Sequence, residues 1–154
     1  QSRSSAASDV YKRQAIMYRL ELENFCLEFN PTIHENDLPF PVNTSLNIKV
    51  FSYGFSADAV MDIDVRGLAD FAISLNRLYE TLKGSAILET PYGVHSYIEF
   101  IAFNGGHIKV KGNIHNGNAY GYEQELIFEN ELDQTYLKSF VKDLFADFEK
   151  YVGR

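Results

Sequence analysis

The sequence predicts an α+β domain with a largely antiparallel sheet of about eight strands and two long helices, in the order ββββ-α-ββββ-α. The first observation is that apolar and polar residues alternate in four segments before residue 65 and in four more between residues 85 and 129. The second is that each group is followed by one stretch in which apolar residues recur every three or four positions, as on one face of a helix.

The first four strands are expected over residues 18–24, 25–29, 46–53 and 55–64. The segment between the second and third strands, residues 30–43, contains Pro31, Pro39 and Pro41 and is therefore expected to be a loop. In the fourth strand the inward residues are Phe55, Ala57, Ala59, Met61 and Ile63, and the outward residues are Asp58, Asp62 and Asp64.

The first helix is expected over Val65–Gly84. Gly84 supplies a residue that tolerates the left-handed conformation that ends many helices. Because burial of a whole apolar face requires a partner surface, this helix is expected to lie on the sheet. Its apolar face consists of Leu68, Phe71, Ala72, Leu75, Leu78, Tyr79 and Leu82.

The second half repeats this plan, with strands expected over residues 85–90, 94–103, 107–112 and 119–129 and a polar loop over residues 113–118. Asp133 is a suitable N-cap for a second helix that runs to about Tyr151. In the eighth strand one face carries Tyr120, Tyr122, Gln124, Leu126 and Phe128, and the other carries Glu123 and Glu125.

The length of 154 residues favours a single domain over residues 17–154. Residues 1–16 are expected to be a disordered tail, because residues 4–14 look like a translated sequencing adaptor. These sixteen residues carry three basic side chains and one acidic side chain, so without them the net charge changes from −7 to −9. An acidic domain is poorly suited to nucleic acid and well suited to a basic partner.

A single cysteine, Cys26, allows no intramolecular disulfide and fits a reducing compartment such as the cytoplasm. No apolar run reaches the roughly 18 residues of a membrane-spanning helix. His95, His107 and His115 lack the close pair that zinc sites commonly use, so no metal and no cofactor are expected. We expect a monomer or a weak dimer.

Acidic side chains on the predicted strands are the candidate functional residues. Asp58, Asp62 and Asp64 share one strand face, and Glu123 and Glu125 share another. Three interpretations remain open: a solvated outer face, a site for Mg²⁺ or Ca²⁺, and an acidic protein-binding surface. For the last of these, Tyr120 and Tyr122 would add the aromatic anchors that interfaces favour.

Three segments resemble the WapI-type immunity proteins of bacterial contact-dependent toxin systems. They are residues 62–84, residues 106–112 and residues 126–137. The resemblance implies a cytoplasmic, non-enzymatic protein that binds and neutralises the nuclease-type C-terminal domain of a polymorphic toxin. A basic toxin groove would then face the acidic residues listed above. The alternatives are a metal-dependent hydrolase that uses Asp62 and Asp64 together with His107, and a non-catalytic scaffold.

Overall fold

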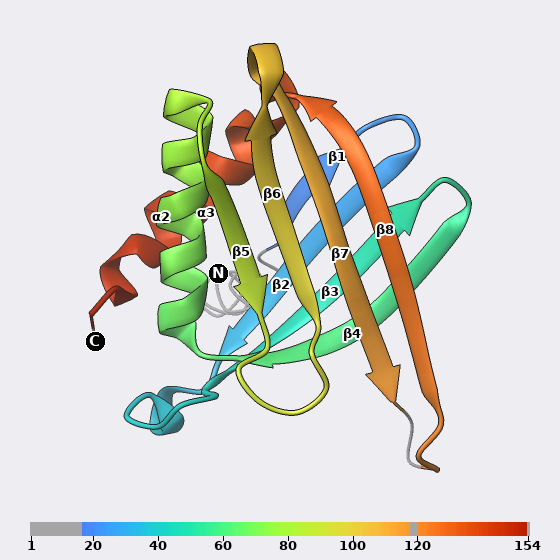
Figure 1. The fold of residues 1–154 in the computed structure, drawn as a ribbon. Coiled ribbons are helices and arrows are strands. Elements are labelled where there is room, and N and C mark those ends of the chain that lie inside the picture. The colour runs from blue at the N-terminus through green and yellow to red at the C-terminus, as the bar shows by residue number, and fades with distance from the viewer. Residues whose placement is uncertain (1–16, 118–119, 154) are drawn as a thin grey trace, which may run out of the picture.

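The computed structural model describes residues 17–117 and 120–153, and the predicted tail, residues 1–16, lies outside this range. The α+β class and the order ββββ-α-ββββ-α are confirmed (Figure 1). The eight strands form two four-stranded antiparallel sheets. We call β1-β2-β3-β4 the N-terminal sheet and β5-β6-β7-β8 the C-terminal sheet, in the order in which the strands lie side by side.

The N-terminal sheet contains a longer second strand than the sequence predicts. Strand β2 passes through Pro31, which we expected in a loop, and ends at Ile33 opposite Thr44. Because β1 pairs with β2 only as far as Phe29, one side of β2 is open at Pro31, where a residue without an N–H is tolerated. The strands are β1 (Tyr18–Glu21), β2 (Phe25–Ile33), β3 (Thr44–Ser52) and β4 (Phe55–Ile63).

The C-terminal sheet corrects two predicted boundaries. Residues 113–117, predicted as a loop, belong to β7 because each of them pairs with a residue of β8. Strand β8 begins at Glu123, so Tyr120 and Tyr122 precede the strand instead of lying on one of its faces. The strands are β5 (Ser85–Glu89), β6 (Tyr97–Phe103), β7 (His107–Gly117) and β8 (Glu123–Asp133).

Helix α2 (Val65–Thr81) has a cap at each end and ends before Gly84, its predicted last residue. Asp64 is its N-cap, and its Oδ1 accepts hydrogen bonds from the backbone N of Arg66 at 2.9 Å and from Nε of Arg66 at 2.8 Å. These hydrogen bonds from Arg66 hold the pKa of the Asp64 carboxyl below its usual range. At the other end Leu82 adopts the left-handed conformation that ends the helix; Gly84, which was predicted for this role, also has a positive φ but lies two residues beyond the cap.

The second predicted helix consists of three consecutive pieces. The predicted cap, Asp133, accepts a hydrogen bond from the backbone N of Thr135 at 3.0 Å, as an N-cap does. The pieces are a 3-10 helix (Gln134–Leu137), helix α3 (Lys138–Phe148) and a further 3-10 helix (Glu149–Tyr151).

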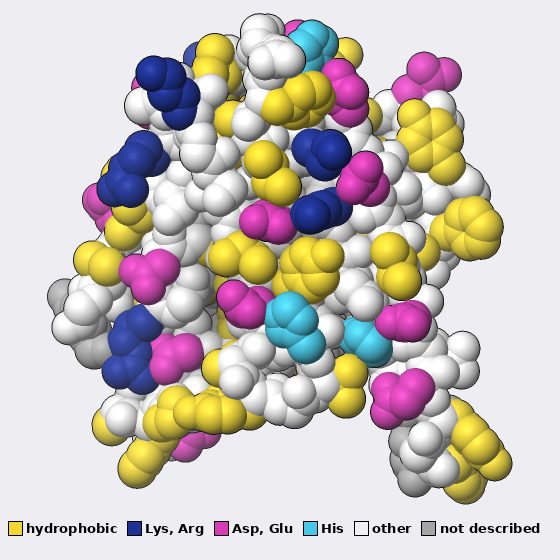
Figure 2. Space-filling model, viewed as in Figure 1, with side chains coloured by type: hydrophobic (Ala, Val, Ile, Leu, Met, Phe, Trp, Pro, Cys, Tyr) yellow, Lys and Arg dark blue, Asp and Glu magenta, His cyan; other side chains and the backbone are white. Residues whose placement is uncertain are grey.

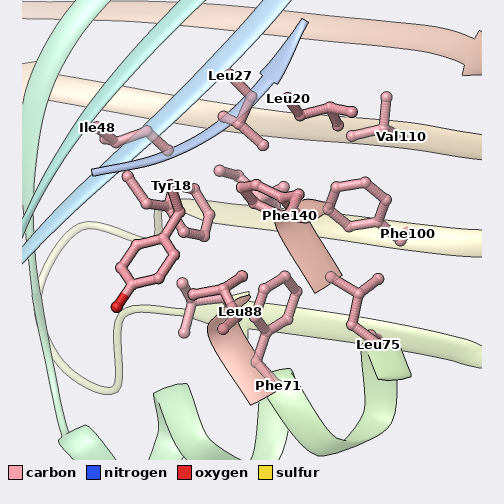
Figure 3. Packing of buried hydrophobic residues seen from close by; sticks show 14 of the residues in the cluster. Tyr18, Leu20, Leu27, Ile48, Phe71, Leu75, Leu88, Phe100, Val110 and Phe140 are labelled. Atoms are coloured by element: carbon pink, nitrogen blue, oxygen red, sulfur yellow. The ribbon is translucent and has the colours of Figure 1, made fainter. Parts of the chain in front are cut away.

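Four phenylalanine rings join the two sheets and the two helices. Figure 3 labels three of them, Phe71, Phe100 and Phe140. Phe29 of β2 contacts Phe71 of α2 at 6.1 Å and Phe140 of α3 at 5.3 Å, both measured between ring centroids. Phe100 of β6 contacts the same two rings, at 6.1 and 6.2 Å. All four side chains are almost fully buried, so these rings form the centre of the core.

A buried asparagine fixes residues 34–42, which we call the proline-rich segment, to the start of α2. The side-chain nitrogen of Asn43 donates a hydrogen bond to the carbonyl oxygen of Phe40 at 3.0 Å. Its side-chain oxygen accepts hydrogen bonds from the backbone N of Val65 at 2.8 Å and from the hydroxyl of Thr44 at 3.0 Å. The segment, which includes a 3-10 helix over Glu35–Asp37, therefore has an anchored base.

Gly112→Ala should lower the free energy of unfolding by about 1–3 kcal/mol, the usual cost of overpacking. A Cβ at Gly112 would lie 2.6 Å from the carbonyl oxygen of Tyr97 and 2.8 Å from the ring of Phe128. Gly67→Ala is the matched control, because α2 leaves open space there and alanine favours helix by about 0.5–1 kcal/mol. Urea unfolding of both variants measures the difference, and equal stabilities would contradict the packing at Gly112.

Asp64→Ala should lower the free energy of unfolding at pH 7 by about 1 kcal/mol, the typical value of an N-cap. Because the folded-state pKa of Asp64 is lowered, its contribution is complete above the ordinary carboxyl pKa of about 3.9. The contribution disappears as the pH falls through the lowered value. Unfolding curves between pH 2 and pH 7 test this, with the exposed neighbour Asp62→Ala as the control.

Candidate partner-binding surface

The predicted acidic residues lie on two different sheets. Asp58 and Asp62 are exposed on the outer face of β4, whereas Glu123 and Glu125 are exposed on β8. Their inward neighbours, such as Ala59 and Phe128, belong to the common core. The outer faces of the two sheets therefore point away from the core in different directions, and the structure does not join these carboxylates into one row.

Asp64, the fifth predicted carboxylate, does not belong to either row. Strand β4 ends at Ile63, and the Asp64 side chain turns to cap α2. Its Oδ2 also accepts a hydrogen bond from Nη2 of Arg66 at 2.6 Å. The Asp64 carboxylate, held by Arg66 and by the N-terminus of α2, stabilises the fold. Its position is therefore explained without a binding partner.

The row on β8 is longer than the sequence analysis predicts. The alternation continues past Glu125 along the same face, so that Ile127 lies between two pairs of glutamates. Glu131, the last glutamate on this face, is absent from the predicted strand because that strand was expected to end at residue 129. The unbroken alternation of residues 123–133 was the signal that could have found it. We call Glu123, Glu125, Glu129 and Glu131 the β8 glutamate row.

The β8 glutamate row keeps a net negative charge, although three of its members have basic neighbours on β7. Glu125 contacts His115 at 3.3 Å, Glu129 contacts Lys109 at 3.6 Å and Glu131 contacts His107 at 3.2 Å. All three glutamates are about half exposed in these contacts; the two histidines carry a charge only when protonated, and exposed ion pairs contribute little to stability. Figure 2 shows acidic, basic, histidine and hydrophobic side chains interleaved over this sheet.

The β7–β8 hairpin extends the C-terminal sheet at the end where the glutamate row begins (Figure 1). Tyr120 and Tyr122 lie in the turn of this hairpin, with 86% and 68% of their surfaces exposed. Glu123, the first residue of β8, follows directly, and its carboxylate lies over Gly117. The structure thus brings the two predicted tyrosines and the first glutamate together, although the tyrosines are not on the strand.

The outer face of the N-terminal sheet is acidic as well. A groove of about 520 Å³ crosses it, and its lining includes Cys26, the bases Arg19 and Lys49, and the carboxylates of Glu21, Glu23, Glu28 and Asp58. Arg19 bonds to Glu21 at 2.8 Å, and Lys49 lies opposite Asp58 in the strand register. Burial raises the pKa of the Cys26 thiol, which favours its neutral form.

The residues of the hydrolase alternative are not assembled. His107 begins β7 at one end of the C-terminal sheet and contacts Glu131, while Asp62 lies near the end of β4 (Figure 1). Asp64 is held by Arg66. Within residues 17–117 and 120–153, no group of three His, Cys, Asp or Glu side chains converges as a metal site requires.

Comparison with known proteins identifies the family. The model of the immunity protein WapI-like family matches residues 16–152. No curated protein and no solved structure matches the chain. Among the described helices, none is long and apolar enough to span a membrane. The family match covers nearly the whole chain, and the resemblance inferred from residues 62–84, 106–112 and 126–137 is confirmed. The chain belongs to the WapI-like immunity protein family.

Proposed function

We propose that this immunity protein neutralises a nuclease-type toxin domain by covering its basic substrate groove with the β8 glutamate row. The observation that carries the proposal is four exposed glutamates on one strand face, against two lysines on the neighbouring strand. Family membership implies a cognate toxin as the partner; the nuclease class and the acidic surface are our own inference.

Electrostatics supports this pairing. A nuclease neutralises the phosphates of its substrate with lysine and arginine side chains, so its groove is basic. Alternate residues of a strand project about 7 Å apart, so the β8 glutamate row forms two pairs of negative charges on one face, one pair on each side of Ile127. Such a row attracts a basic groove over a distance of about one Debye length and accelerates the encounter.

Tyr120 and Tyr122 would supply the apolar part of the interface. Interfaces concentrate their binding energy in a few aromatic or arginine side chains, with charged residues around them. Both tyrosines are largely exposed and lie next to Glu123 at the start of the glutamate row. We propose that they anchor the hairpin tip against the rim of the toxin groove.

Asp58 and Asp62 belong to a second candidate surface. The groove beside Asp58 is lined by four carboxylates together with Arg19 and Lys49, so it is acidic too, but no tyrosine of the described residues lines it, whereas two exposed tyrosines adjoin the β8 glutamate row. The proposal also includes a cytoplasmic location and a monomer or weak dimer, because a toxin that cleaves nucleic acid acts inside the cell and one acidic face suffices to cover it.

The double variant Glu125→Lys/Glu129→Lys should weaken binding to the toxin domain encoded beside this gene by at least tenfold, because it reverses the centre of the glutamate row. The matched control Asp58→Lys/Asp62→Lys changes the net charge equally on the other sheet and should alter the Kd by less than threefold. Calorimetry at two salt concentrations measures both. Equal losses in the two variants would contradict an interface on β8.

The toxin class is tested separately. The isolated toxin domain should cleave RNA or DNA, and an equimolar amount of this protein should stop the cleavage, because the groove is covered. The Glu125→Lys/Glu129→Lys variant should protect only at a correspondingly higher concentration. A toxin domain that binds tightly but leaves every nucleic acid intact would contradict the nuclease assignment and would leave the binding surface supported.

A further inference from the structure

We infer that the free edge of β8 receives an extended, basic segment of the toxin domain as a fifth strand of the C-terminal sheet. This inference rests on the proposed function and specifies how the partner is held. Three features of the structure support it: an unpaired strand edge, an exposed apolar side chain beside it, and the charge of the adjacent row.

The unpaired edge is unusually long. Strand β8 contains 11 residues and is the last strand of its sheet, paired on one side with β7. Throughout the described residues, no other strand shares a backbone hydrogen bond with β8. Natural edge strands are often short, or protected by proline or by charged side chains, above all lysine; β8 is long, contains no proline or lysine, and carries acidic side chains, which repel acidic strands but not basic ones. The backbone N–H and C=O groups that point away from β7 are therefore available for strand addition.

A groove follows this edge. It has a volume of about 440 Å³ and is lined along one side by six consecutive residues of β8, 125–130. A lining of consecutive residues means that the groove runs along the strand. The other side is formed by Ser52, Tyr53 and Phe55 at the tip of the β3–β4 hairpin, which extends beyond β8 (Figure 1).

Phe55 lacks the cover that its position predicts. It occupies the same face of β4 as Ala59, Met61 and Ile63, all of which are buried in the core. Yet 69% of Phe55 is exposed, because the hairpin tip passes beyond β8, the last strand of the opposite sheet. Hydrophobic side chains gather at this side of the molecule (Figure 2). One more strand beside β8 would cover Phe55 as the other strands cover its neighbours.

Charge determines which strand fits. On the outer face, the side chains of an added strand would lie beside Glu125, Ile127 and Glu129. Lysine or arginine at alternate positions would pair with these carboxylates, while the intervening apolar residues would contact Phe55. A second copy of β8 would instead bring glutamates next to glutamates, which is destabilising. The structure thus favours an extended segment of alternating basic and apolar residues over self-association.

Amide hydrogen exchange, followed by NMR on the full chain with and without the neighbouring toxin domain, tests strand addition directly. Within residues 125–130, the backbone amides that point away from β7 should exchange rapidly in the free protein. Their exchange should be at least tenfold slower in the complex. Strand β5 is the internal control, since it forms the opposite edge of the same sheet and should show no change.

Phe55→Ala should weaken toxin binding at least fivefold, because the added strand loses its apolar contact. The matched control is Phe40→Ala, which removes an equally large side chain, 62% exposed, from the proline-rich segment at the other end of β4. Both side chains are exposed, so both variants should keep the melting temperature of the parent protein, and the comparison reports on binding alone.

The remaining outcomes separate the two proposals. If the toxin binds in a glutamate-dependent manner but β8 gains no protection and Phe55→Ala equals Phe40→Ala, strand addition is wrong and the proposed function stands. If the toxin domain does not bind at all, both are wrong. Protection of β8 in the free protein that increases with its concentration would identify a second copy as the occupant and would overturn the inference.

Discussion

The contact among Phe29, Phe71, Phe100 and Phe140 is the constraint on which the rest of the structure depends. Each four-stranded sheet has one apolar face that it cannot bury alone, and each helix has one apolar stripe. The four rings come one from each of these elements, so every element is held to two others through aromatic contacts of about 5–6 Å. The relative position of the two sheets is therefore fixed by the core and not by a connecting loop.

This fixed position determines what the surface offers. A second aromatic contact, between Phe25 of β2 and Phe128 of β8 at 5.7 Å, holds the sheets together close to the edge of the C-terminal sheet. Beyond this contact the β3–β4 hairpin continues without a facing strand, which leaves Tyr53 and Phe55 uncovered. The proposed binding edge is thus a consequence of two sheets of equal strand number packed with an offset. In our proposal, the glutamates determine which partner this edge accepts.

Periodicity predicted the class, the order of elements and most inward-facing residues, because burial of one face requires that pattern. It failed at residues 113–117, in which Ile114 is the one apolar side chain and is buried: these residues are extended because β8 lies opposite them. Periodicity also could not show that Asp58 and Glu125 lie on different sheets, because alternation identifies the face of a strand but not the sheet to which the strand belongs. Phe55 shows the same limit, since its position in the pattern marks it as core and only the offset of the sheets exposes it.

The buried side chain of Asn43 has a consequence for how this chain can change during evolution. Its hydrogen bonds hold the base of the proline-rich segment against α2, so the residues beyond that base contribute little to the core. Lengthening a surface loop costs only a fraction of a kcal/mol when its ends are already held. Residues 34–42 can therefore gain, lose or exchange residues while the two sheets stay in place, which gives the lineage a region that diversifies without loss of the fold.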